Sequence, residues 1–107
     1  MTIADWLDAR SPAPPAQLLE RLRAALGPTL ARDAAAVPQV FVDAAVTLLD
    51  TLLRAGCVAR DRALDLLAVD ALVTYAFEAA SDDPESLEAR AHEAMRRLAN
   101  LASPASP

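Results

Sequence analysis

One cysteine and one histidine occur in the sequence, and these are the side chains that most often pair as nucleophile and base. Cys57 follows Gly56 at a predicted helix start, where the helix dipole and a nearby arginine would favour the thiolate, and His92 would then accept the proton. No third residue is spaced to orient the histidine. We therefore interpret Cys57 as a packed thiol and His92 as a surface imidazole.

Acidic residues are plentiful, but their spacing does not fit a metal or cofactor site. Glu88 and His92 are four residues apart, whereas di-iron bundles use Glu-x-x-His, and a single histidine leaves a zinc site short of ligands. Asp82, Asp83 and Glu85 fit a turn and a helix cap better than a calcium loop. Two separated glycines cannot form a phosphate loop, and no G-x-S-x-G motif occurs. We expect no metal, no cofactor and no catalytic activity.

Four acids, Asp43, Asp50, Asp70 and Glu78, recur at helical spacing within otherwise apolar segments. The first two belong to a polar stripe with Thr47 and Arg54, and the last two to a stripe with Thr74 and Ser81. Buried acids would indicate a functional site, whereas a polar stripe usually faces water. We interpret both stripes as solvent-facing, with Asp50 and Arg54 spaced for an ion pair.

The composition favours a single all-α domain. The 107 residues include many Ala and Leu, only two Gly, and 54% hydrophobic residues, which favours helix over strand and excludes disorder for most of the chain. The net charge of −5 argues against nucleic-acid binding, because phosphate contacts need a concentrated basic field. The nearest basic cluster, Arg54, Arg60 and Arg62, is diluted by neighbouring aspartates.

The segment from Ala63 to Ala80 has the length of a membrane span, about 27 Å if helical. It contains Asp65, Asp70 and Glu78, and each acid near a bilayer centre costs about 2.5 kcal/mol or more. We therefore expect a core helix and no membrane partner. No charged and then apolar leader opens the chain, so we expect a cytoplasmic protein.

Proline and glycine divide the chain into segments with helical periodicity. We predict one domain over residues 1–103 and a disordered tail over 104–107. The predicted helices cover residues 2–10, 15–26, 28–37, 39–55, 59–80 and 84–101. Thr2 is expected to cap the first helix together with Asp5, Gly27 to end the second, and Pro38 to break the chain between two helices. The predicted fold is an antiparallel helical bundle, with four main helices and one or two short ones.

The last predicted helix has an apolar seam formed by Leu87, Ala91, Ala94, Leu98 and Leu101. Its outer face carries charged residues at i,i+4 spacing, including Glu93 with Arg97. We expect it to pack by the seam and to expose the charges.

The helices predicted at 39–55 and 59–80 carry apolar arcs of about 200°, roughly twice what a surface helix needs. Either they form the centre of a compact domain or part of them pairs with another chain. We expect a protein-interaction module that is a homodimer and that binds another protein through an apolar helix face. The alternative is a carrier for an apolar small molecule, such as a lipid or tetrapyrrole, and an enzyme built on the carboxylates is a more distant rival. The candidate interface or pocket residues are Phe41, Leu48, Leu52, Leu66, Val73, Tyr75 and Phe77.

Overall fold

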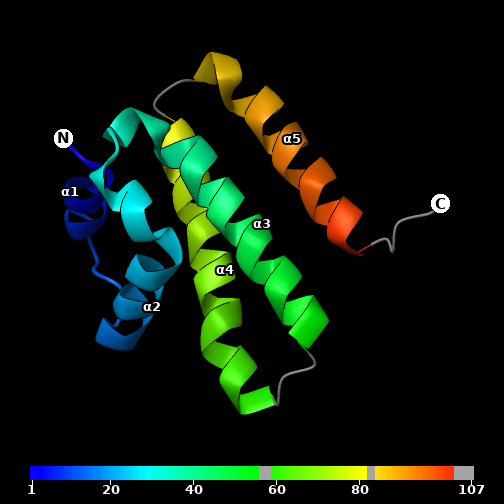
Figure 1. Ribbon diagram of the computed structural model, residues 1–107. Coiled ribbons are helices and arrows are strands. Elements are labelled where there is room, and N and C mark those ends of the chain that lie inside the picture. The colour runs from blue at the N-terminus through cyan, green and yellow to red at the C-terminus, as the bar shows by residue number, and fades with distance from the viewer. Residues whose placement is uncertain (56–58, 82–83, 103–107) are drawn as a thin grey trace.

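Two long antiparallel helices, α3 (Val37–Ala55) and α4 (Ala59–Ala80), form a hairpin at the centre of the structure. The computed structural model describes residues 1–55, 59–81 and 84–102. Helices α1 (Ile3–Asp8) and α2 (Ala16–Leu26) lie on one side of the hairpin, and α5 (Pro84–Ala102) lies on the other (Figure 1). The predicted all-α helical bundle is confirmed.

The ends of the first two helices follow their sequence signals. The Thr2 hydroxyl accepts a hydrogen bond from the Asp5 backbone N–H, and the Asp5 carboxylate accepts one from the Thr2 N–H, both at 3.2 Å. This reciprocal pair is the capping box that the spacing predicts. Gly27 ends α2 with φ of 51°, a left-handed conformation that residues with a Cβ rarely adopt.

The single helix predicted over residues 28–37 is wrong. The chain instead forms two 3₁₀-helices, η1 (Gly27–Ala31) and η2 (Ala34–Ala36), separated by extended backbone at Arg32. The Ile3 N–H donates to the Arg32 carbonyl at 2.8 Å, and the Ala34 N–H donates to the Met1 carbonyl at 2.9 Å. These bonds to the start of the chain compete with helical bonding, and local periodicity cannot reveal them.

Small side chains allow α3 and α4 to pack closely. The buried side of α4 carries Ala68, Leu72, Ala76 and Ala80, which recur every four residues. Across from it, α3 contributes Phe41, Ala45, Leu48 and Leu52, all buried. Because alanines occupy most of the buried row of α4, its larger apolar side chains lie on its flanks, where other elements must cover them.

Helix α1 completes the core at one end of the hairpin. Trp6 packs edge-on against Phe41 of α3, with ring centroids 5.6 Å apart, and against Tyr75 of α4 at 6.0 Å. Ile3 and Leu7 of the same helix are also fully buried. A six-residue helix is too short to be stable alone, so this packing holds it in place.

Helix α5 packs through its apolar seam, in which Ala94 is buried and Ala91, Leu98 and Leu101 are half-buried. Its charged residues pair differently from the expectation. Arg96 binds Glu93 at i,i+3 spacing, whereas Arg97 binds Asp43 of α3. The predicted pair of Glu93 with Arg97 is therefore replaced by a contact between helices, which only the packing of α5 on α3 makes possible.

Candidate functional site

Three leucines near the connected end of the hairpin are largely exposed. The exposed fractions are 57% for Leu53, 49% for Leu66 and 56% for Leu67. Leu53 lies just before the end of α3, and the other two lie about two turns into α4. We call these three residues the hairpin-end patch.

The patch begins where α3 is no longer covered by a neighbouring helix. Val42, Leu49 and Leu53 are spaced by seven and four residues, so they share one side of this helix. Val42 is 8% exposed, Leu49 is half-buried and Leu53 is 57% exposed. One side of a single helix is thus buried at its start and exposed at its end.

The position of α5 accounts for this increase in exposure along α3. Helices α3 and α5 run in the same direction (Figure 1), and the Arg97–Asp43 ion pair shows which turns of the two helices lie side by side. The described part of α5 continues five residues beyond Arg97, to Ala102, which is about 7.5 Å. Leu53 lies ten residues beyond Asp43, which is about 15 Å along α3. The described part of α5 therefore ends short of Leu53.

The seven residues predicted to line an interface or pocket do not form one surface. Phe41, Leu48 and Leu52 are buried in the core, with exposed fractions of 0%, 7% and 5%, so they offer little surface to a partner protein. Val73, Tyr75 and Phe77 are partly buried and pack against the core, and Leu66 is exposed.

Sequence reasoning missed Leu53 and Leu67 as candidate residues. Both lie within the apolar arcs of their helices, and periodicity cannot show which part of an arc a neighbouring helix leaves uncovered. One signal was present in the sequence: Leu66 and Leu67 flank the alanine-rich row that includes Ala68 and Ala76. A row of small side chains is the one that approaches a neighbour closely, so adjacent large residues lie outside that contact.

The acidic stripes lie at the surface, as predicted. Asp70, Thr74 and Glu78 are exposed on α4, and Ser81 is exposed directly after it. On α3, Asp43 and Asp50 are partly exposed, and the Arg54 Nε donates to the Asp50 carboxylate at 2.9 Å. Among the residues whose side chains the structure describes, which leave out Arg60, Asp61, Glu85 and Arg90, no charged side chain is buried. The four acids therefore lack the burial that would single them out as a catalytic site.

His92 is exposed on α5, whereas Cys57, Asp82, Asp83 and the tail over 104–107 lie outside the described residues. Across residues 1–55, 59–81 and 84–102, no group of three or more His, Cys, Asp or Glu side chains gathers as metal ligands. Of the arginines expected to cluster at the hairpin turn, Arg54 is exposed and Arg62 is half-buried.

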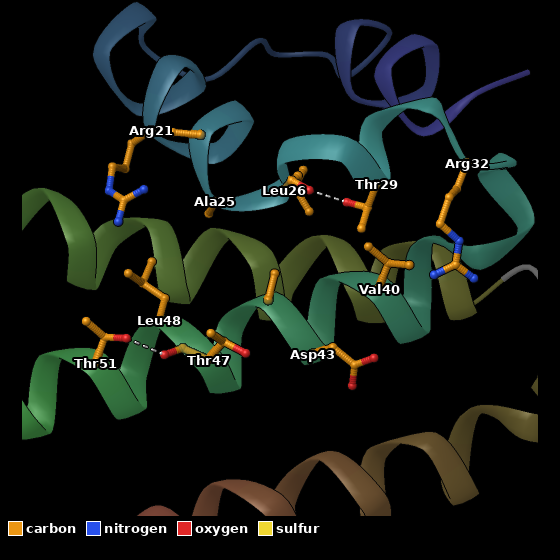
Figure 2. A pocket seen from close by; sticks show the side chains of 12 residues that line it. Arg21, Ala25, Leu26, Thr29, Arg32, Val40, Asp43, Thr47, Leu48 and Thr51 are labelled. Atoms are coloured by element: carbon orange, nitrogen blue, oxygen red, sulfur yellow. Dashed lines mark hydrogen bonds between the residues drawn. The ribbon is translucent and has the colours of Figure 1, made fainter.

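A groove of about 440 Å³ runs between α2 with η1 and the part of α3 from Val40 to Thr51 (Figure 2). Leu48 is the candidate residue from the sequence that lines it, whereas Phe41, Tyr75 and Phe77 do not. Figure 2 shows Arg21 and Arg32 at opposite ends of the groove, with Val40, Thr47 and Leu48 between them.

Among the described helical segments, Ala34–Ala55 has the length and composition of a membrane span, with a mean hydropathy of 1.5. This differs from the segment that the sequence suggested, Ala63 to Ala80. In its most apolar window, 39% of the residues are buried inside the fold. A core helix passes the same test of length and hydropathy, so this feature is weak support for a membrane span.

The fold and the patch define a small all-α bundle whose central hairpin is covered over part of its length. Comparison with protein-family models, with curated proteins and with solved structures gives no match for this chain.

Proposed function

We propose that the protein is a self-associating interaction module, in which the hairpin-end patch of one copy packs against the same patch of a second copy. The observation that carries the proposal is the exposure of Leu53, Leu66 and Leu67 at one end of the hairpin. Two helical hairpins that meet through apolar faces form a four-helix core, which is a common homodimer arrangement.

The size of the patch supports a weak dimer. Completing the burial of a half-exposed leucine is worth about 1 kcal/mol, so six leucines in a symmetric dimer give about 6 kcal/mol. The motional freedom lost on association opposes this gain by an amount of the same order. The dimer is therefore expected to be weak and to exchange with monomer.

Charges around the patch allow two copies to approach. Next to Leu53, the Arg54 side chain is 78% exposed and is paired with Asp50, so both signs of charge are present beside the leucine. The whole chain carries a net charge of −5, so two copies repel one another at long range. Salt screens this repulsion and leaves the apolar contact intact, so added salt should strengthen the dimer.

Sedimentation equilibrium from low micromolar to millimolar concentration tests the proposal. Wild-type protein should shift from monomer to dimer across this range. A variant carrying Leu53→Gln and Leu66→Gln should stay monomeric, with unchanged helix content and unfolding temperature, because both side chains are already half-exposed. Met95→Gln is the matched control, because Met95 is 68% exposed but lies on α5. This variant should dimerise like the wild type.

Three results would overturn the proposal. A wild-type protein that stays monomeric at millimolar concentration has no self-associating patch. Equal loss of dimer in the Met95 variant would mean that any exposed apolar residue contributes. A dimer that survives the leucine substitutions but changes Trp6 fluorescence on dilution would point to exchange of α1 between chains.

A further inference from the structure

The groove between α2, η1 and α3 exists because small side chains face each other across it. Ala25 of α2 and Ala44 of α3 line it together with Leu26, Val40 and Leu48, and we call these five apolar residues its floor. Figure 2 labels four of them, Ala25, Leu26, Val40 and Leu48. The groove's volume of about 440 Å³ falls within the range of small-molecule sites. The part of α3 that lines it, from Val40 to Thr51, is about 16 Å long.

Three charged side chains line the groove, and one of them, Arg32, forms no ion pair with a described residue. Arg21 binds Asp65 of α4, and Asp43 accepts from Arg97 and, at 3.0 Å, from Gln39. Arg32 also lines the groove, and it forms no ion pair with any described residue. An exposed guanidinium therefore lies at one end of an apolar floor.

Two of the three threonines of the groove do not compete for this role. The Thr29 hydroxyl donates to the Leu26 carbonyl, and the Thr51 hydroxyl donates to the Thr47 carbonyl at 3.0 Å. With these protons engaged, the two hydroxyls offer only lone pairs, which repel an anion. Among the charged side chains of the groove, Arg32 is thus the donor suited to bind a negatively charged group.

We propose that the groove binds a free aliphatic carboxylic acid of medium chain length, with its carboxylate on Arg32 and its chain along the alanine floor. A guanidinium binds a carboxylate with two parallel hydrogen bonds, which fixes the orientation of the ligand. The chain then covers apolar surface at Ala25, Ala44 and Leu48. This site lies on the α2 side of α3 and does not depend on the hairpin-end patch.

Decanoate is the probe, and decan-1-ol is its neutral counterpart with the same chain. Amide chemical shifts are followed by NMR during titration at constant pH. Decanoate should bind saturably and shift the amides of Ala25, Val40 and Leu48, whereas decan-1-ol should bind about tenfold more weakly. Arg32→Gln should weaken decanoate about tenfold and leave decan-1-ol unchanged. Ala44→Phe should abolish binding of both by filling the floor.

Arg54→Gln is the control for charge. It removes an exposed arginine at the end of α3 that is far from Arg32, so it should leave decanoate binding unchanged. The inference is overturned if decan-1-ol binds wild-type protein as tightly as decanoate. It is also overturned if Arg54→Gln weakens decanoate as much as Arg32→Gln does. Amide chemical-shift changes centred on Leu53 and Leu66 would likewise contradict it, because they would show that decanoate binds to the exposed leucines and not in the groove. Circular dichroism of each variant verifies that it is folded.

Discussion

The guanidinium carbon of Arg10 lies 3.7 Å from the ring centroid of Trp6, and the same guanidinium binds the Glu78 carboxylate of α4 at 2.7 Å. The Arg10 Nε also donates to the Trp6 carbonyl at 3.0 Å. Arg10 therefore covers the outer face of the indole, while Phe41 and Tyr75 contact the ring from the core. Through these contacts, a six-residue helix becomes part of the packed domain.

Replacement of Trp6 by alanine should lower the free energy of unfolding by about 3–5 kcal/mol, because it removes a buried aromatic and leaves a cavity. Urea denaturation followed by circular dichroism measures this change. Trp6→Phe is the control and should lose less, because it keeps an aromatic ring beside Phe41. A loss below about 1 kcal/mol for the alanine variant would show that α1 does not unfold together with the rest of the domain.

Because α3 and α4 pack closely, replacing a buried alanine of α4 by leucine should destabilise the protein much more than the same replacement of an exposed alanine. Ala76 is 1% exposed, so Ala76→Leu should destabilise the protein by about 1–3 kcal/mol through overpacking. Ala63 is exposed on the same helix, and Ala63→Leu should change the stability by less than about 0.5 kcal/mol. Thermal unfolding of the two variants compares them directly. Equal changes in stability for the two variants would contradict the close packing of Ala76 against α3.

The sequence was sufficient to predict most helices, because their signals are local. Thr2 and Asp5 form the predicted cap, Gly27 ends α2, and the polar stripes face water. The error at residues 28–37 has a nonlocal cause, since Arg32 and Ala34 bond to the start of the chain. The candidate site was predicted less well. An apolar arc shows that a helix needs cover, but the exposure of Leu53 depends on where α5 ends.

The Arg97–Asp43 ion pair should contribute little to stability even though it links two helices. Its side chains are 30% and 50% exposed, and partly exposed pairs are worth about 0.2–1 kcal/mol. A double-mutant cycle with Arg97→Ala and Asp43→Ala measures the coupling. Arg96 and Glu93, which pair within α5, provide the comparison cycle. A coupling above about 2 kcal/mol would mean that the pair is more protected from solvent than its exposure indicates.

The cap of α1 predicts an acid-sensitive contribution to stability. The hydrogen bond from the Thr2 backbone, and then the Thr2 hydroxyl, lower the pKa of Asp5 from its ordinary value. Because the folded pKa lies below the unfolded one, the contribution is present above the unfolded pKa of about 3.9 and is lost as the pH falls through the folded pKa. The stability difference between wild type and Asp5→Asn should therefore shrink in acid. Thr2→Ala removes the hydroxyl but keeps the backbone N–H, so an NMR titration of this variant should show the pKa of Asp5 returning only partway toward its ordinary value. A complete return would contradict the backbone hydrogen bond as the larger cause.

The raised pKa of Tyr75 predicts a contribution to stability that is lost at alkaline pH and not in acid. Burial is the larger cause that raises its pKa, and the Glu78 carboxylate adds to the effect, while Arg10 opposes it. Because the unfolded chain loses the phenol proton first, the contribution of Tyr75 is complete below about pH 10 and is lost as the pH rises through the folded pKa. Stability should fall over this interval in the wild type and less in Tyr75→Phe.

The titration of Tyr75 can be followed without interference, because the chain has one tyrosine and no lysine. Tyrosinate absorbance in folded protein therefore reports this group alone. Glu78→Gln removes the smaller cause, so the pKa of Tyr75 should fall partway and remain above its ordinary value. A complete return to the ordinary value would show that the carboxylate, and not burial against Trp6, is the main cause of the shift.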